Sequence, residues 1–257
     1  YFRIQRDVTK EYIIPFINSS LDTTVKRTNI LEVGCGEAGV LHAFLEQGAN
    51  HCVGIELSAG RVELANTFLS KEYSSDRFSI HCQNIHDPSI RLRYKDSFDI
   101  IVLKDVIEHI HDRPEMMMTL KSLLKRNGAI FMAFPPWQMP FGGHQQNSTS
   151  RFVKMAPWIH LLPLDAYLAL VKQFDHRPGF IEGLKEIRDT RLPIGEYESL
   201  VKESGYREIA RQDYLINPIY YYKFGFKPRR QANWISQTNG LRNLVTTCVY
   251  SMIVSDN

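Results

Sequence analysis

The sequence ILEVGCGEAG (residues 30–39) contains an apolar run that ends at closely spaced glycines and is followed by a helical pattern. Glycine at such a turn lets the backbone bend sharply and lets a ligand approach without a side chain in the way. Glu56 ends the next apolar run, 22 positions after Gly34. A carboxylate at about this spacing accepts hydrogen bonds from ribose hydroxyls. Together these residues predict a site for a ribose-containing ligand; the alternative is a plain strand–helix turn with a solvated carboxylate.

Two histidines have the chemistry of a proton acceptor near neutral pH. His109 follows the fourth apolar run, and His144 lies in FGGHQQ (residues 141–146), soon after the fifth. Both are expected at the carboxyl ends of parallel strands, where α/β proteins form their sites. We favour His144 as a general base because a short glycine-flanked loop carries it. The alternative roles are a loop-supporting hydrogen bond for His109 and a structural anchor for His144.

The strands and helices that position these residues can be predicted from the sequence. Continuous apolar runs alternate with amphipathic patterns, and this alternation predicts a parallel sheet covered by helices on both faces. An opening amphipathic helix is expected around residues 8–17. The predicted strands are Asn29–Val33, His51–Ile55, Phe78–Cys82, Phe98–Leu103, Ala129–Phe134, Tyr206–Tyr214 and Leu244–Ile253. The predicted helices are Ala38–Gln47, Ala59–Ser70, Asp105–Ile110, Glu115–Lys125 and Ile194–Glu203, with a turn at Asn127-Gly128.

The alternation stops at Pro135-Pro136. Residues 137–193 are rich in Pro, Gly, Trp and His, yet they are too apolar for a linker. We predict that they form a lid over the sheet edge. Residues 1–257 are therefore expected to form a single domain, with a core of about 25–136 and 194–257 and an insertion of about 137–193.

Several motifs resemble, in the right order, those of class I S-adenosylmethionine-dependent methyltransferases. ILEVGCGEAGVL is similar to the first motif of the family, VGIELS to its acidic strand end, and SFDIIVLKDVIEHI to its fourth-strand block. LKSLLKRNGAIFMAFP is similar to the fifth-strand block, although Arg126-Asn127-Gly128 lacks the usual Pro and first Gly. The resemblance covers Ile30 to about Phe134 and, more loosely, Gly195–Tyr214. It implies a Rossmann-like, doubly wound and mostly parallel sheet with a lid insertion after strand five.

The resemblance also implies S-adenosyl-L-methionine as the cofactor and assigns residues to its methionine end. Gly34, Cys35 and Gly36 would pass beneath the methionine part, and Glu32 would support that loop. Lys104, which closes the fourth strand, would offer its backbone carbonyl to the ammonium group.

At the adenosine end, the resemblance assigns Glu56 to the ribose and Leu57 to the adenine face. Asn84 stands where the family often has Asp and would accept a hydrogen bond from the adenine amino group. Ile85 would flank the ring. The pattern G-C-G-x-x-G leaves a dinucleotide-binding protein as the runner-up, which Glu37 disfavours because its charge would repel a pyrophosphate.

Composition limits the partners. Hydrophobic residues make up 44% and charged residues 23% of the chain, which predicts a globular protein. The net charge of +3 is too small to argue for nucleic-acid or membrane binding. Four cysteines without a C-x-x-C pattern, together with His81, Cys82 and His86 at spacings unlike a metal motif, predict no disulfide framework and no metal site. No signal peptide and no apolar run of membrane-spanning length is visible, so we expect a cytoplasmic protein.

The predicted function is methyl transfer to oxygen or nitrogen of a small-molecule acceptor. The aromatic and cationic segment Tyr220–Arg230 is interpreted either as a pocket wall with a cationic rim or as a packed segment with solvated charges. Two other functions remain open: an RNA- or protein-modifying methyltransferase that uses this basic segment, and a non-catalytic nucleotide-binding module. The sequence does not predict an oligomeric state.

Overall fold

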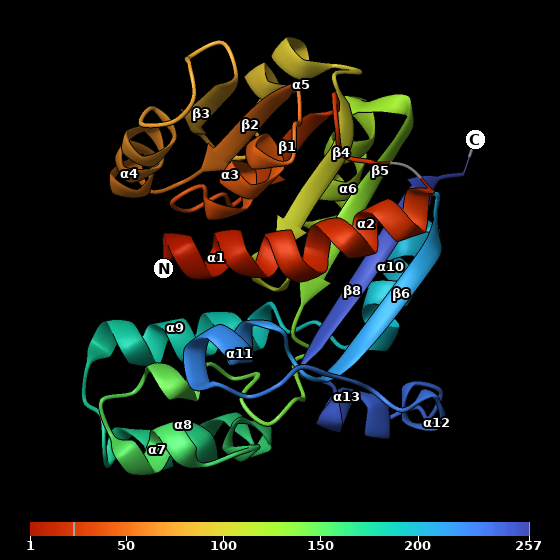
Figure 1. Cartoon of the computed structure of the whole chain (residues 1–257). Helices are drawn as coiled ribbons and strands as arrows, with labels where there is room; N and C mark the ends of the chain where they lie inside the picture. Colours follow the sequence, from red (N-terminus) through yellow and green to blue (C-terminus); the bar gives the residue numbers. More distant parts are fainter. Residues whose placement is uncertain (23, 257) are drawn as a thin grey trace.

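The computed structural model describes residues 1–22 and 24–256 and shows one eight-stranded sheet with the order β3-β2-β1-β4-β5-β8-β6-β7 (Figure 1). Strands β1 to β5 pair in parallel, and β8 and β6 continue the sheet in antiparallel pairing. The strands are β1 (Asn29–Val33), β2 (His51–Glu56), β3 (Phe78–Cys82), β4 (Phe98–Lys104), β5 (Leu124–Phe134), β6 (Tyr206–Ile216), β7 (Arg229–Arg230) and β8 (Cys248–Ser255). The predicted Rossmann-like fold class is confirmed.

Helices cover both faces of this sheet. Those of the core are α1 (Phe2–Val8), α2 (Ile14–Leu21), α3 (Gly39–Glu46), α4 (Ala59–Leu69), α5 (Pro88–Tyr94), α6 (Arg113–Leu123) and α10 (Ile194–Glu203), with a π-helical stretch, η1 (Thr9–Ile13), between α1 and α2. Towards the C-terminus follow α11 (Ile219–Phe224), α12 (Asn233–Ser236) and α13 (Leu241–Val245). None of the helices in the described ranges is long and apolar enough to cross a bilayer.

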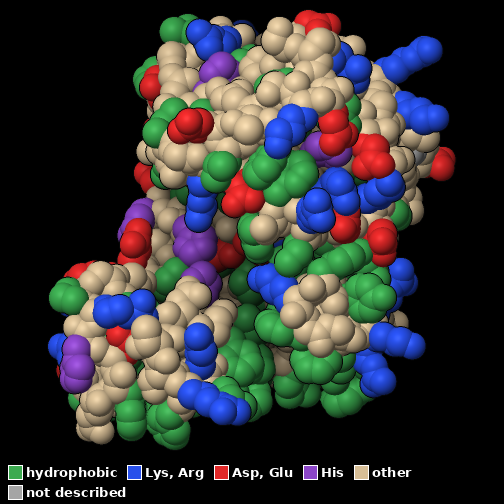
Figure 2. Space-filling view, turned by 60° about the vertical axis from the view of Figure 1, so that its left-hand side comes forward, with side chains coloured by type: hydrophobic (Ala, Val, Ile, Leu, Met, Phe, Trp, Pro, Cys, Tyr) green, Lys and Arg blue, Asp and Glu red, His purple; other side chains and the backbone are tan. Residues whose placement is uncertain are grey.

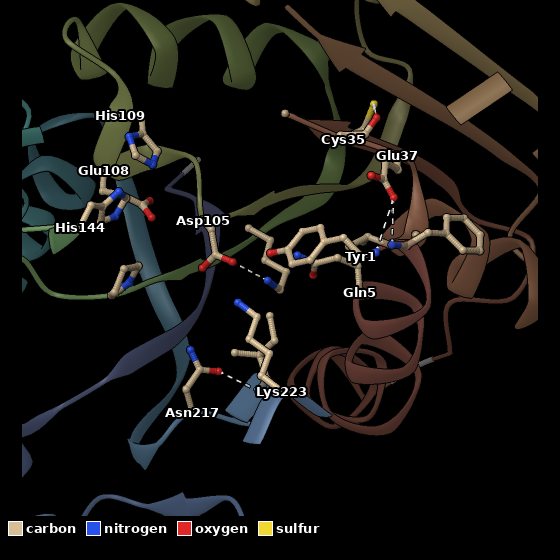
Figure 3. Close-up of a pocket in the computed structure, with 18 of the residues that line it drawn as sticks. Tyr1, Gln5, Cys35, Glu37, Asp105, Glu108, His109, His144, Asn217 and Lys223 are labelled. Atoms are coloured by element: carbon tan, nitrogen blue, oxygen red, sulfur yellow. Dashed lines mark hydrogen bonds and ion pairs between the residues drawn. The ribbon is translucent and has the colours of Figure 1, made fainter. Parts of the chain in front are cut away.

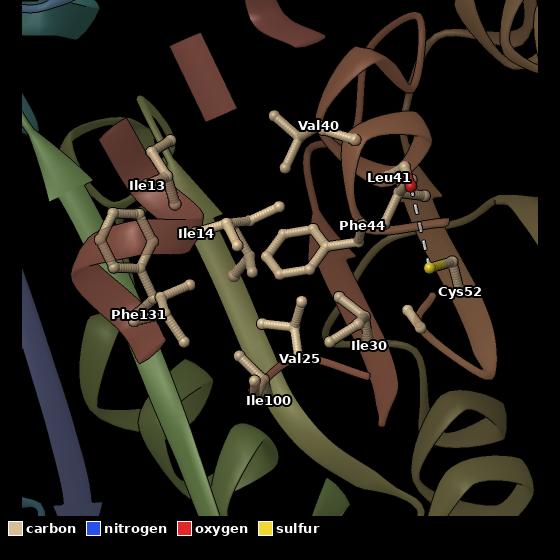
Figure 4. Packing of buried hydrophobic residues seen from close by; sticks show 14 of the residues in the cluster. Ile13, Ile14, Val25, Ile30, Val40, Leu41, Phe44, Cys52, Ile100 and Phe131 are labelled. Atoms are coloured by element: carbon tan, nitrogen blue, oxygen red, sulfur yellow. Dashed lines mark hydrogen bonds between the residues drawn. The ribbon is translucent and has the colours of Figure 1, made fainter. Parts of the chain in front are cut away.

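Alternate residues of the central strands supply two separate hydrophobic clusters, one on each face. Ile30 and Phe131 belong to the cluster that packs under α2 and α3, around Phe44 (Figure 4). Their neighbours Leu31 and Met132 belong to the opposite cluster, with α6 and α10. Because every second side chain of a strand points to one face, a strand buried on both faces must be apolar throughout. This explains why continuous apolar runs were good predictors of β1, β2, β4 and the second half of β5.

Residues 137–193, which were predicted as an insertion, form a mostly helical segment after β5 that we call the insertion from here on. It contains η3 (Gln145–Asn147), α7 (Arg151–Met155), η4 (Ile159–Leu161), α8 (Leu164–Lys172) and α9 (Pro178–Asp189). Its helices bury a small cluster of their own that includes Val153, Tyr167 and Leu184. In Figure 1 the insertion lies with α11 below the carboxyl ends of β4 and β5.

Three predicted details of the core are wrong. The predicted turn at Asn127-Gly128 lies inside β5, where the register shifts between the pairs Phe98–Leu124 and Ile100–Ala129. Gly128 is needed there for close packing, since a Cβ would lie 2.8 Å from a methyl group of Leu124.

The predicted helix Asp105–Ile110 is a single 3-10 turn, η2 (Ile107–His109), because Asp105 adopts a left-handed conformation with φ of 55°. Helices α5, α11, α12 and α13 and the short β7 were not predicted. Because α13 occupies residues 241–245, the last strand begins at Cys248 and not at the predicted Leu244.

Candidate active site

A cavity of about 630 Å³ lies at the carboxyl edge of the parallel strands. Its walls come from α1, the glycine turn after β1, the end of β4, the insertion and α11 (Figure 3). Segments far apart in the sequence therefore meet at this edge, where the prediction had placed the functional residues.

The glycine turn between β1 and α3 presents bare backbone to the cavity. Gly34 and Gly36 have φ of +69° and +54°, a region that side chains disfavour. The amide N–H groups of Gly34 and Cys35 donate to the carbonyl of Ile55 at 2.7 and 3.1 Å, which ties the turn to β2. A Cβ on Gly34 would lie 2.5 Å from a methyl of Val106, whereas one on Gly36 would meet nothing within 4 Å. Gly36 thus leaves open space beside the turn.

Glu56 fixes the same turn from the neighbouring strand. One carboxylate oxygen accepts from the amide of Gly36 at 2.9 Å, and the other accepts from the amide of Ser58 at 2.9 Å. The residue is buried, with 7% of its surface exposed. Each carboxylate oxygen has a second lone pair, so both remain able to accept from a ribose hydroxyl. The structure therefore adds a loop-holding contact to the predicted ribose-binding role.

Glu32 and Lys104 form the buried polar floor of the cavity. Burial raises the pKa of Glu32 well above its usual value, with Lys104 opposing this, and its Oε2 has no hydrogen-bond partner within the described residues. The Lys104 ammonium lies 2.5 Å from a carboxylate oxygen of Asp105. Burial lowers the pKa of Lys104, but the charge and hydrogen bond of Asp105, together with the charge of Tyr1, outweigh burial and hold the pKa above the usual value. The side chain of Lys104 is thus an internal ion-pair partner, which the prediction for its backbone carbonyl did not foresee.

The predicted cofactor residues fall into two groups. Glu32, Gly34, Cys35, Gly36 and Lys104 line the cavity.

The other four lie outside the cavity wall, at the carboxyl ends of β2 and β3. Glu56 and Leu57 close β2, and Leu57 is 71% exposed. Asn84 is exposed after β3, where its side-chain oxygen accepts from the amide of His86 at 3.0 Å, and Ile85 is buried. Their adenosine-binding roles stay predictions.

Both predicted histidines line the cavity, and they face each other. The ring centroids of His109 and His144 are 5.2 Å apart and the rings meet edge to face. Burial, reinforced by the positive charge of His109, lowers the pKa of His144 to about 4. Burial also lowers the pKa of His109. Both imidazoles are therefore neutral near pH 7, the form that accepts a proton.

Glu108 is a cavity residue to which the sequence interpretation gave no role. Only 8% of it is exposed, and its Oε2 has no partner in the described part of the chain. Burial, and then the charge of Asp105, raises its pKa well above the usual value. Its place beside His109 in the fourth-strand block was the available signal. The described residues contain no cluster of His, Cys, Asp and Glu suited to a metal ion, and the metal prediction stays a prediction.

Helix α1, near the N-terminus, and helix α11, in the C-terminal part of the chain, also contribute to the cavity. Gln5 of α1 and Tyr220 and Lys223 of α11 line it, and Figure 3 shows the Lys223 amine directed towards Asp105. The start of the segment Tyr220–Arg230 thus contributes two residues, Tyr220 and Lys223, to the cavity wall. Gln5 could not have been found from the sequence, because only the tertiary packing of α1 on α3 brings it to the site.

Comparison with known proteins gives a family. A family model described as methyltransferase domain matches residues 3–175, which is more than half of the chain. Ubiquinone biosynthesis O-methyltransferase of Pelagibacter ubique (strain HTCC1062) is 26% identical over 130 residues, which cover 51% of this chain and 50% of that protein. The enzyme of the same name from Haemophilus ducreyi (strain 35000HP / ATCC 700724) is 27% identical over 109 residues, 40% of this chain and 44% of that protein. The match thus spans about half the length of these relatives or less.

Solved structures share the fold. Geranyl diphosphate C-methyltransferase from Streptomyces coelicolor A3(2), solved with Mg²⁺, geranyl diphosphate and S-adenosyl-L-homocysteine, aligns with a TM-score of 0.60 at 12% identity, covering 95% of this chain and 76% of that chain. The plantazolicin methyltransferase BamL, in complex with a triazolic desmethylPZN analog and SAH, aligns with a TM-score of 0.59 at 14% identity, covering 100% of this chain and 86% of that chain.

The glycine turn, the acidic end of β2 and the sheet order define a Rossmann-like protein of the class I S-adenosylmethionine-dependent methyltransferase type. With the family match over residues 3–175, the chain belongs to the methyltransferase domain family, whose cofactor is S-adenosylmethionine. The residues fit this cofactor, because Gly36 opens onto free space and the buried Oε2 of Glu32 has no partner within the described residues. The dinucleotide-binding runner-up is set aside.

Proposed function

We propose that this protein transfers a methyl group from S-adenosylmethionine to an oxygen or nitrogen atom of a small molecule. The observation that carries the proposal is the shared cavity: the glycine turn and the His109–His144 pair line the same space of about 630 Å³. A volume of this order accommodates a small organic acceptor beside the methionine end of the cofactor. The O-methyltransferase names of the curated relatives support acceptance at oxygen.

The bound cofactor supplies an electrophilic methyl group, and the protein supplies alignment and proton transfer. The turn at Gly34 and Gly36 holds the methionine end, and Glu56 holds the ribose while it keeps the turn in place. As the acceptor oxygen or nitrogen forms its bond to carbon, its proton passes to a ring nitrogen of His144. His109 is the second candidate for this role.

Two carboxyl groups, the buried Glu108 and the partly exposed Asp105, tune the acceptor side of the cavity. Burial raises the pKa of Glu108 well above its usual value and so favours the protonated form, which can donate a hydrogen bond there. Asp105 stays paired with Lys104, so this ion pair carries no net charge. Lys223 then remains as a cation beside the acceptor.

The test is a turnover assay with S-adenosylmethionine and a panel of small phenols, carboxylates and amines, with release of S-adenosylhomocysteine as the readout. We expect transfer to at least one class of small acceptor. The matched controls are Gly36→Val, which fills the space beside the turn and should abolish transfer, and His176→Gln on the exposed surface, which should not. Methylation of RNA or of protein with none of the small molecules would overturn the proposal.

A further inference from the structure

Exposed apolar side chains gather at one end of the molecule. Of the 16 large hydrophobic residues that are exposed in the described chain, 11 lie in residues 137–193 or 214–255. These are Phe152, Met155, Trp158, Leu162, Phe174, Leu215, Tyr221, Phe224, Phe226, Trp234 and Leu244. Figure 2 shows hydrophobic side chains and Lys or Arg together on the lower half of the molecule, beside its hollow. Contiguous exposed apolar surface marks an interaction site, and two pairs of these rings lie together: Phe152 with Phe174, and Phe224 with Phe226.

The charged side chains of the C-terminal segment are all positive. Between Asp213 and Asp256 the sequence contains five Lys or Arg residues and no Asp or Glu. One of the five, Arg242, is held by both carboxylate oxygens of Glu198 at 2.7 Å. Lys223 faces the cavity. The remaining three, Lys227, Arg229 and Arg230, are exposed.

Aromatic rings connect this surface to the cavity. Tyr220 lines the cavity, and its ring centroid is 5.7 Å from that of Phe224. The ring of Phe224 is in turn 6.1 Å from that of Phe226. Phe224 and Phe226 are 62% and 59% exposed. The row of rings therefore runs from the wall of the cavity to the outer surface.

We propose that the C-terminal aromatic surface (Tyr221, Phe224, Phe226 and Trp234 with Lys227, Arg229 and Arg230) binds the surface of an anionic lipid bilayer. Tyr and Trp rings favour the interface between headgroups and acyl chains, where an apolar body and a polar edge are both solvated. Lysine and arginine gain attraction to anionic headgroups within a Debye length. Bound in this way, the protein has the cavity wall at Tyr220 next to the lipid.

Two other occupants fit the surface less well. RNA would use the rings for stacking and the cations for phosphate, but the exposed aliphatic neighbours Leu215 and Leu244 gain from lipid and not from bases. A second copy of the chain, related by a twofold axis through the surface, would bring the cations of Lys227, Arg229 and Arg230 against themselves.

The experiment is co-sedimentation of the protein with vesicles of phosphatidylcholine alone or mixed with phosphatidylglycerol. We expect binding to the mixed vesicles that weakens as salt rises. The double variant Phe224→Ser, Phe226→Ser should lower the partition coefficient on both vesicle types at least tenfold. The triple variant Lys227→Gln, Arg229→Gln, Arg230→Gln should lower it more than tenfold on mixed vesicles only, at about fivefold for each cation.

Leu92→Ser is the matched control, because Leu92 on α5 is 86% exposed and lies at the opposite end of the molecule (Figure 1). Thermal unfolding and S-adenosylhomocysteine binding show whether each variant is folded, and neither readout requires a known acceptor. In the wild-type protein, quenching of Trp234 fluorescence by brominated lipid, absent in Trp234→Phe, locates the contact without disturbing the aromatic row.

Absence of vesicle binding by the wild-type protein overturns the proposal, as does binding that survives both multiple variants. RNA binding that the triple variant loses, without vesicle binding, would assign the surface to nucleic acid. Dimerisation that the double variant loses, without vesicle binding, would assign it to a second copy. The proposal does not depend on which acceptor is methylated, so its failure leaves the proposed function standing.

Discussion

The imidazole rings of His109 and His144 meet edge to face across the cavity, with centroids 5.2 Å apart. His109 ends the 3-10 turn after β4, and His144 precedes the 3-10 turn η3 of the insertion. A proton on either ring repels a proton on the other, in addition to the cost of burying charge. The pair therefore takes up one proton much more readily than two, and it supplies a single neutral base at neutral pH.

Removal of that base should slow turnover without loss of cofactor affinity. We expect His144→Gln to lower the rate by about 10²–10⁴-fold, as is usual for loss of a general base. Cofactor binding should change little, because His144 belongs to the insertion rather than to the glycine turn. The measurements are turnover on an acceptor from the panel and calorimetric binding of S-adenosylhomocysteine, with His176→Gln as the control. Full activity of His144→Gln together with loss in His109→Gln would move the role to His109.

The lowered pKa of His144 should also appear as a pH dependence of stability. An unfolded histidine has a pKa of about 6.5, whereas in the folded protein burial, with the charge of His109, lowers it to about 4. Between these values the unfolded chain binds more protons, so the stability that depends on neutral His144 is complete above pH 6.5 and is lost as pH falls towards 4. The difference corresponds to about 3 kcal/mol.

Chemical unfolding of wild type and His144→Gln from pH 4 to pH 7 tests this effect. As the pH falls, the free energy of unfolding of the variant should rise relative to that of wild type, because glutamine does not titrate and the variant does not lose this part of its stability. A pH-independent difference between the two proteins would contradict the pKa assigned to His144.

Much of the parallel half of the fold was predictable, because the apolar patterns that define its strands lie within single short segments of the sequence. The bounds of β1 and β3 were predicted without error. β1 is a short, largely apolar run that ends at Gly34. Residues 125–128 were not predicted as strand, because the bulge depends on how Phe98 pairs with Leu124 across the sheet. Helix α5 escaped notice because its seven residues bury only Ile90.

The residues of the candidate site were predictable only where they come from one continuous segment of the sequence. The glycine turn is such a segment, and Gly34 and Gly36 line the cavity as expected. The contributions of Gln5 and Lys223 arise from packing between chain ends far apart in the sequence. The meeting of His109 with His144 depends on the path of the insertion, which no periodicity of its sequence defines.

Glu56 should contribute to cofactor affinity through two different contacts. Glu56→Ala removes both the acceptor for a ribose hydroxyl and the acceptor for the amides of Gly36 and Ser58. We expect S-adenosylhomocysteine to bind about 1–3 kcal/mol more weakly, as for loss of a charged hydrogen bond. Glu56→Gln keeps one acceptor oxygen and should lose less. Unchanged calorimetric affinity in Glu56→Ala would show that the ribose binds elsewhere.

The insertion should respond to ligands if it acts as a lid. It supplies Met139 and His144 to the cavity wall, so an acceptor held between them and the glycine turn would bridge the insertion and the core. We expect amide hydrogen exchange across residues 137–193 to slow when cofactor product and acceptor are both bound, and to change less with either alone. Exchange in α4, away from the insertion, serves as the internal reference. Equal exchange in all states would identify the insertion as a static part of the fold.

The two glycines of the turn should differ in what they protect. Gly34→Ala places a methyl group 2.5 Å from a side-chain methyl of Val106, and it does so at φ of +69°. Gly36→Ala carries a similar backbone penalty at φ of +54° but meets no atom within 4 Å. The left-handed conformation costs an alanine about 1–2 kcal/mol, and overpacking adds about 1–3 kcal/mol. Gly34→Ala should therefore lose more stability than Gly36→Ala.

Cofactor affinity should rank the two variants the other way round: Gly34→Ala loses more stability, whereas Gly36→Ala loses more affinity for the cofactor. The Cβ of Gly36→Ala points into open space of the cavity, where the cofactor would lie, so binding should weaken although the fold tolerates the change. Val106→Ala, alone and combined with each glycine variant, gives the matched control. It removes the clashing methyl, so it should restore part of the stability of Gly34→Ala but none of the affinity of Gly36→Ala. Thermal unfolding and S-adenosylhomocysteine titration of wild type, the three single variants and the two double variants measure both quantities. If Gly36→Ala bound the cofactor as well as the wild type does, the turn would not be the cradle for the methionine end.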